Sequence, residues 1–100
     1  MTASTRPFDA ANYLESTADQ ADLLSDAVDS GDQRYIAYAL GAVARARGGI
    51  GKLARETGMN RQALHKALSE DGNTTLETVL KVLKALGLQM RIEAAEAEAA

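Results

Sequence analysis

The fold is determined by residues 50–68, which read Ile-Gly-Lys-Leu-Ala-Arg-Glu-Thr-Gly-Met-Asn-Arg-Gln-Ala-Leu-His-Lys-Ala-Leu. Two short helices that cross steeply need a small residue at the backbone contact and a residue that tolerates positive φ in the turn. Ala54 meets the first need and Gly58 the second. Apolar residues that fix the corner are also required, and they are Leu53, Met59, Leu64 and Leu68. The stretch therefore predicts a helix-turn-helix, with helices over about 50–56 and 61–68.

Three further helices are predicted on either side of this stretch. The first opens at Thr17 or Asp19 and ends at Gly31. The second runs from an Asp32 N-cap to about residue 47, and the last begins at Thr75 and ends at Gly87. The expected buried faces are Leu23, Leu24, Ala27 and Val28 in the first helix; Ile36, Ala39, Leu40, Val43 and Ala44 in the second; and Leu76, Val79, Leu80, Leu83 and Leu86 in the last.

Residues 88–93 alternate apolar and polar side chains, which indicates a strand. A lone strand leaves its backbone groups unpaired, so it would pair with another chain, such as a second copy of this one. An extension of the last helix into the Glu/Ala tail is the alternative. We therefore predict an all-α, five-helix fold with a short C-terminal strand that pairs across a dimer. The expected divisions are an arm and acidic helix (1–31), a helix-turn-helix domain (32–88) and a strand with an acidic tail (89–100).

The net charge of −3 is distributed unevenly along the chain. Residues 1–32 carry seven acids and one arginine, residues 33–92 carry ten Lys/Arg and four acids, and residues 93–100 add three glutamates. Screening confines charge effects to roughly 10 Å. A basic region between acidic flanks can therefore attract phosphate locally, although charges that merely coat a soluble surface would give the same distribution.

Several function classes are excluded by composition. The chain has no cysteine and one histidine, so a disulfide, an ordinary zinc site and a cysteine nucleophile are ruled out, and we expect no metal. No run of 18 apolar residues exists and residues 1–7 lack the core of a signal peptide, so we expect no membrane association and a cytoplasmic protein.

Two motif matches fail on their context. Residues 49–54 fit G-x-G-x-x-A, but they follow a helix and no βαβ unit surrounds them. His65, Ser69 and Asp71 supply triad residue types without a nucleophile elbow or oxyanion loop. We therefore expect no cofactor, no catalytic residue and no enzyme activity.

The second helix of residues 50–68 presents a polar N-terminal end. Arg61 could donate two hydrogen bonds to guanine, and Gln62 could pair with adenine. Asn60 lies on the same end, and His65 and Lys66 follow one turn later, although Asn60 can serve as a cap only and His65 as an ordinary exposed residue. Phosphates suit Lys66, Lys52, Arg55 and the first amides of the preceding helix, although Arg55 could instead pair with Glu56 or be solvated. These residues predict a DNA-binding surface.

Further motifs extend from Tyr35 to Leu88. They are residues 35–41 (YIAYALG), 44–48 (ARARG), 53–58 (LARETG), 61–64 (RQAL), 67–73 (ALSEDGN), 75–76 (TL) and 82–88 (VLKALGL). With these motifs, residues 50–86 resemble the phage-repressor-like helix-turn-helix domains of the xenobiotic-response-element class. Residues 8–88 resemble more closely the addiction module antidote family, the HigA-like antitoxins.

The resemblance implies a homodimeric repressor of its own operon that neutralises a small RelE/HigB-like toxin, usually an mRNA-cleaving ribonuclease. It places Arg61, Gln62 and Lys66 at base-reading positions. It also places Asn73 and Thr74 in a loop that touches phosphate, although Thr74 stands where relatives often have proline.

Acidic residues recur at helical spacing in the first predicted helix, and they are Asp19, Asp22, Asp26 and Asp29. This stripe is either a solvated helix face or a docking surface for the basic cleft of such a toxin. Two alternatives to the antitoxin stay open. One is a stand-alone transcriptional repressor, and the other is a protein-interaction module that has lost DNA binding. For a dimeric DNA binder, we expect an operator with inverted half-sites roughly 10 bp apart.

Overall fold

The computed structural model describes residues 16–69 and 73–96. Within these residues the chain forms helices joined by short turns, and no strand is present. The helices are α1 (Thr17–Ser30), α2 (Gln33–Ala46), α3 (Ile50–Thr57), α4 (Arg61–Ala67) and α5 (Leu76–Ala85). The predicted all-α, five-helix fold is confirmed. The predicted arm, residues 1–8, lies outside the described residues.

Side chains next to the helix N-termini explain where four of the helices begin. Each accepts a hydrogen bond from a backbone N–H of the first turn, which has no partner within the helix. The acceptors and donors are Ser16 with Asp19, Asp32 with Arg34, Asn60 with Ala63, and Thr75 with Thr78, at 2.9 to 3.2 Å. The caps predicted at Asp32, Asn60 and Thr75 are confirmed, and α1 is capped by Ser16.

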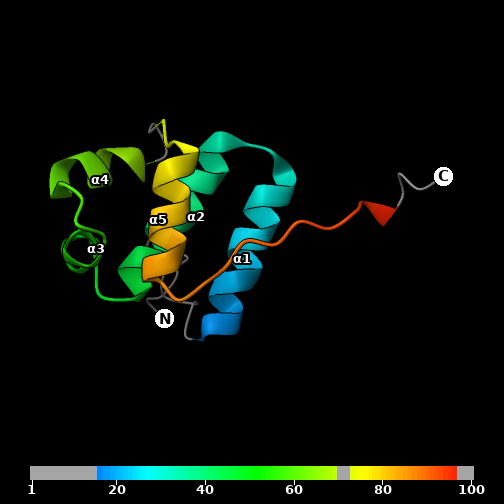
Figure 1. The fold of residues 1–100 in the computed structure, drawn as a ribbon, viewed down its shortest axis with the longest axis horizontal. Coiled ribbons are helices and arrows are strands. Elements are labelled where there is room, and N and C mark those ends of the chain that lie inside the picture. Colours follow the sequence, from blue (N-terminus) through cyan, green and yellow to red (C-terminus); the bar gives the residue numbers. More distant parts are fainter. Residues whose placement is uncertain (1–15, 70–72, 97–100) are drawn as a thin grey trace, which may run out of the picture.

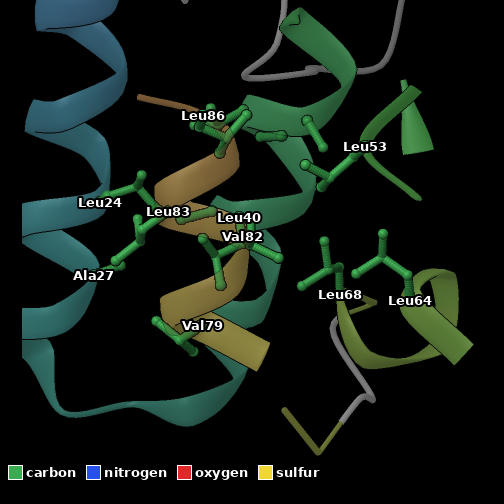
Figure 2. Packing of buried hydrophobic residues seen from close by; sticks show 14 of the residues in the cluster. Leu24, Ala27, Leu40, Leu53, Leu64, Leu68, Val79, Val82, Leu83 and Leu86 are labelled. Carbon is green, nitrogen blue, oxygen red and sulfur yellow. The ribbon is translucent and has the colours of Figure 1, made fainter. Parts of the chain in front are cut away.

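The helices pack around α2, which lies between α1 on one side and the α3–α4 pair on the other (Figure 1). The largest fully buried side chains come from α2, α4 and α5, and they are Leu40, Val43, Leu64 and Val82. Figure 2 shows Leu64 of α4 and its C-cap residue Leu68 directed towards the α2 and α5 side of this core, with Leu24 and Ala27 of α1 approaching from the other side. One core therefore anchors both α4 and α1.

A polar contact supplements this core at the ends of three helices. Arg47, the C-cap of α2, donates from Nη1 to Oε1 of Gln20 (3.1 Å) and to the backbone oxygen of Leu86 (2.9 Å). Gln20 is only 4% exposed, so its side chain needs such a partner. Arg47 thus joins α1 and the end of α5 to the end of α2.

The predicted buried face of α5 is partly wrong. Leu76 and Leu80 are 66% and 49% exposed, whereas Val82, which was not predicted, is fully buried. The buried stripe consists of Val79, Val82, Leu83 and Leu86, which share one helix face at spacings of three and four. Both stripes have helical periodicity, so the side from which α2 and α3 approach decides between them. Val28 of α1 was also predicted to be buried and is 43% exposed.

Within one chain, the segment after α5 forms neither the strand nor the helix extension that the sequence indicates. Residues 88–95 form neither a helix nor a strand, so the extension of the last helix is wrong. The backbone N–H of Leu88 donates to the oxygen of Leu83 at 2.9 Å, and the segment then runs across α1 (Figure 1). It lines a groove with residues of α1, α2 and α5. Strand pairing with a second copy stays a prediction.

Candidate nucleic-acid interface

The corner between α3 and α4 is built from the residues that the sequence predicts. Gly58 has φ 75°, and its N–H donates to the oxygen of Ala54 at 2.9 Å, which ends α3 in the left-handed conformation that glycine adopts without strain. Ala54 is 7% exposed, so a larger side chain would have no room there. Thr57, which sequence reasoning missed, adds a support because its hydroxyl donates to the oxygen of Leu53 and accepts from the N–H of Met59.

Polar side chains cover the outer surface of this corner. All the predicted site residues on α3, on α4 and in the turn are exposed, and they are Lys52, Arg55, Asn60, Arg61, Gln62, His65 and Lys66. Glu56 is the one acid among residues 50–67. We call this surface the basic face. Figure 1 shows α3 and α4 at one end of the described fold and the acidic helix α1 at the other, so the two charge types are separated in space.

Two arginines of the basic face converge at Gly51, in the first turn of α3. A Cβ at Gly51 would lie 3.8 Å from Nε of Arg61 and 3.9 Å from Nη1 of Arg55. Gly49, the N-cap, supplies no side-chain hydrogen bond. The backbone N–H groups of this turn and the helix dipole favour an anion. Two guanidinium groups beside an uncapped helix N-terminus form an arrangement suited to a phosphate group.

The same geometry refines what Arg61 can do. The Nε atom of Arg61 lies beside Gly51 of α3. Arg61 is therefore close to the first turn of α3, which suits a phosphate, although it belongs to the N-terminus of α4. Gln62, His65 and Lys66 lie further along the exposed surface of α4. Asn60 acts as a cap, because its Oδ1 accepts from the N–H of Ala63. The Asn60 side chain therefore retains its Nδ2 donors and one lone pair of Oδ1 for an outside partner.

A close backbone approach holds α4 against α2. A Cβ at Gly41 of α2 would lie 2.7 Å from the backbone oxygen of Leu68, nearer than ordinary contact allows. Beside this contact a groove is lined by Tyr38 and Arg45 of α2 and by His65 and Ser69 at the α4 end. Sequence reasoning did not single out Gly41, although glycine inside an otherwise regular helix is itself a signal of close packing.

The predicted loop residues Asn73 and Thr74 lie before α5, and the first residue of α2 holds them. Gln33 donates from Nε2 to Oδ1 of Asn73 and, at 3.4 Å, to the backbone oxygen of Thr74. The hydroxyl of Thr74 is shielded from solvent and has no hydrogen-bond partner among residues 16–69 and 73–96. Gln33 was not predicted as a site residue, because forty positions of sequence separate it from Asn73.

Figure 1 shows α1 at the end of the fold opposite α3 and α4. The acidic residues of α1 are exposed, and they are Asp19, Asp22, Asp26 and Asp29. One of these carboxylates, that of Asp26, accepts a hydrogen bond from another helix. Oδ2 of Asp26 accepts a hydrogen bond of 2.6 Å from the hydroxyl of Tyr35 in α2. This bond, together with burial and the charge of that carboxylate, raises the pKa of Tyr35 above its usual value. Asp26 therefore has a structural role in joining α1 to α2.

The described residues contain neither a metal-binding cluster nor a membrane-spanning helix. No group of three or more His, Asp or Glu side chains in residues 16–69 and 73–96 is placed to hold a metal ion. No helix in this part of the chain has the length and apolar content needed to cross a bilayer.

The fold and the basic face together define a small all-α protein whose α3–α4 corner is compatible with a helix-turn-helix. Comparison with known proteins then shows the family. The chain belongs to the family described as "Probable addiction module antidote protein", which it matches over residues 4–94. It is 40% identical over 93 residues to an uncharacterized protein of Haemophilus influenzae strain Rd, a match that covers 93% of this chain and 95% of that protein. No solved structure matches the chain significantly.

Proposed function

We propose that this protein is the antitoxin of a type II toxin-antitoxin module that binds operator DNA as a homodimer, represses its own operon and neutralises a RelE/HigB-like ribonuclease. Its membership of the antidote family supports the antitoxin role. The observation that carries DNA binding is the convergence of Arg55 and Arg61 at the uncapped first turn of α3. The role is regulatory and non-enzymatic, and the proposed location is the cytoplasm.

On DNA, α4 is the helix that enters the major groove. Gln62, with Arg61 and Lys66, reads base edges, and His65 lies one turn further along. Lys52, Arg55 and the first turn of α3 bind the phosphates on one side of the groove, and these contacts set the register of α4 without reading sequence. The basic face carries this role although the whole chain is acidic, because the acids of α1 lie at the other end of the fold.

The dimer places two copies of α4 about 34 Å apart, on inverted half-sites roughly 10 bp apart. Exposed apolar side chains on α5 and on the segment after it supply surface that a second copy would cover, and they are Leu76, Leu80, Met90 and Ile92. Residues 88–93 could also pair there as strands.

The toxin partner is a small basic protein that docks on the acidic face of α1. Asp19, Asp22 and Asp29 are the carboxylates proposed to meet it, because Asp26 already accepts from Tyr35. A nuclease that binds RNA presents cationic side chains to phosphates, and such a surface is complementary to an acidic helix.

DNA binding is tested by fluorescence anisotropy with a labelled duplex that contains the DNA upstream of the protein's own reading frame. Arg61→Ala should weaken operator binding by about 1–3 kcal/mol and relax one base position. Lys52→Ala should weaken all sequences alike and lower the salt slope by roughly one. Lys84→Ala is the matched control, because Lys84 is exposed on α5 and lies outside the basic face.

Two outcomes would contradict parts of this assignment. If Arg61→Ala binds operator as wild type does, the register assigned to α4 is wrong. If the double variant with Arg61→Ala and Gln62→Ala binds every duplex with the affinity of the wild type, the basic face does not read DNA. The protein-interaction module is then the better interpretation.

The toxin partner is tested by co-expression with the neighbouring reading frame and affinity purification of the complex. A small basic protein should co-purify, and Asp22→Asn with Asp29→Asn should weaken its retention. Glu77→Gln is a control, since Glu77 is an exposed acid on α5 that pairs with Lys81 at 3.1 Å. DNA binding without any co-purifying protein would favour the stand-alone repressor.

A further inference from the structure

The side chain of Gln33 joins the start of α2 to the loop that precedes α5. Its single Nε2 group meets two oxygens, Oδ1 of Asn73 and, at 3.4 Å, the backbone oxygen of Thr74. Gln33 itself is held in place because the preceding residue, Asp32, caps α2 through the N–H of Arg34 at 2.9 Å. The contact thus spans forty residues of sequence and starts from the fixed end of a long helix.

The two acceptors determine which way the Asn73 amide faces. A backbone carbonyl can only accept, so the group of Gln33 that meets Thr74 must be its NH₂ group. The same NH₂ group meets Asn73, which must therefore offer its oxygen and not its own NH₂. The two N–H donors of Asn73 Nδ2 then face away from Gln33. Because Asn73 is exposed, it presents donors to the outside of the loop.

We infer that Gln33 is a positioning residue which orients the Asn73 amide so that its N–H donors bind a backbone phosphate of DNA. This inference rests on the proposed function, and it assigns a role to a residue outside the basic face. Without Gln33 the Asn73 amide can rotate, and either its oxygen or its nitrogen can face the phosphate. A phosphate accepts and never donates, so only one of these two orientations binds it.

The arrangement makes a distinctive prediction for specificity and for salt. A contact to phosphate carries no base information, so its loss should weaken operator and unrelated duplexes by the same factor. Asn73 is uncharged and displaces no counterion by charge, so the slope of log K against log salt should stay unchanged. Loss of a lysine contact such as Lys52 lowers that slope, which distinguishes the two kinds of contact.

The experiment measures anisotropy of two labelled duplexes, one upstream of the protein's own reading frame and one of unrelated sequence, at several salt concentrations. The variants are Gln33→Ala, Asn73→Ala, the double variant and Asn73→Asp. Ser25→Ala and Ser25→Asp are control variants, because Ser25 is exposed on α1 and this helix lies at the end of the fold away from the basic face. Thermal unfolding of each variant establishes that the chain is folded.

Asn73→Ala should lose about tenfold or more in affinity on both duplexes, the loss expected for a hydrogen bond to a charged group. Gln33→Ala should weaken binding on its own and add little when Asn73 is already alanine. Asn73→Asp keeps an acceptor for Gln33 but turns a carboxylate oxygen outward, so it should bind more weakly than Asn73→Ala and more weakly than Ser25→Asp.

Three outcomes would overturn the inference. In the first, Gln33→Ala binds like wild type while Asn73→Ala is weakened, so Asn73 needs no positioning. In the second, the losses of the two single variants add fully in the double variant, so the two residues act separately. In the third, Asn73→Asp binds no more weakly than Asn73→Ala. If the wild-type protein binds neither duplex, the proposed function fails, and this inference falls with it.

Discussion

The contact between Gly41 and Leu68 allows a sharp test, because the chain supplies its own control. A Cβ at Gly41 would lie 2.7 Å from the backbone oxygen of Leu68, whereas ordinary contact begins at about 3.4 Å. Gly41→Ala therefore requires α2 and the end of α4 to separate by roughly 0.7 Å. Overpacking of this kind costs about 1–3 kcal/mol. Against it stands the gain of about 0.5–1 kcal/mol that alanine brings to a helix interior.

Gly51→Ala is the same chemical change in another helix. Its Cβ would lie 3.8 Å from the nearest side-chain atom, which is ordinary contact, so only the gain in helix propensity remains. The difference in stability between the two variants should therefore be about 1–3 kcal/mol, with Gly41→Ala the less stable. For a domain of this size that is a difference in Tm of about 4–24 °C.

Thermal and urea unfolding followed by circular dichroism would measure this difference. Unchanged m-values would show that the two variants unfold between comparable states. The reasoning is refuted if Gly41→Ala is as stable as Gly51→Ala, because the Leu68 backbone oxygen would then have moved away from the added Cβ without loss of stability. Wild-type protein is the reference for both, and it should lie between the two variants when the overpacking cost exceeds the propensity gain.

Three further predictions concern a core side chain, a helix cap and a hydrogen bond that depends on pH. Leu64→Ala, at a side chain with no exposed surface, should lower the free energy of unfolding by about 2–5 kcal/mol in urea; a loss well below this range would mean that α4 collapses into the space. Asn60→Ala removes the cap on the N–H of Ala63 and should cost about 1 kcal/mol by the same assay, with Asn60→Ser expected to restore most of it. Tyr35 has a raised pKa in the folded state, so its stabilising bond to Asp26 is complete below a pH of about 10 and is lost as pH rises through the folded value. Between pH 9 and pH 11, the Tm of the Tyr35→Phe variant should therefore fall less than the Tm of the wild-type protein. An identical fall in the variant and the wild type would contradict the assignment.

The exposed leucines of α5 illustrate how far periodicity can reach. Leu76 and Leu80 recur at helical spacing with as good a pattern as Val79, Val82 and Leu83, and the sequence alone does not rank the two stripes. The buried stripe lies in one core cluster with residues of α2 and α3, and neither of these helices is next to α5 in the sequence. The exposed stripe is then left for a partner or for solvent. The spacing of residues in one chain cannot show which of the two stripes lies in the core.

The candidate site divides in the same way. The exposed side chains of α3 and α4 were predicted one by one, because an amphipathic helix shows in sequence which residues face outward. The convergence of Arg55 and Arg61 at Gly51 was not predicted, since it depends on the angle at which α4 crosses α3. The bond from Gln33 to Asn73 was missed for a related reason, as it joins segments that meet only after α2, α4 and α5 have packed.

The sequence by itself determined the helices, the caps at Asp32, Asn60 and Thr75, and the corner at Gly58. These features depend on side chains within a few residues of the backbone groups that they satisfy. The tertiary structure alone decided which face of α5 is buried, which arginines meet at the start of α3 and which way the Asn73 amide faces. Such contacts join residues far apart in the chain, and their geometry follows from how whole helices pack and not from any local pattern.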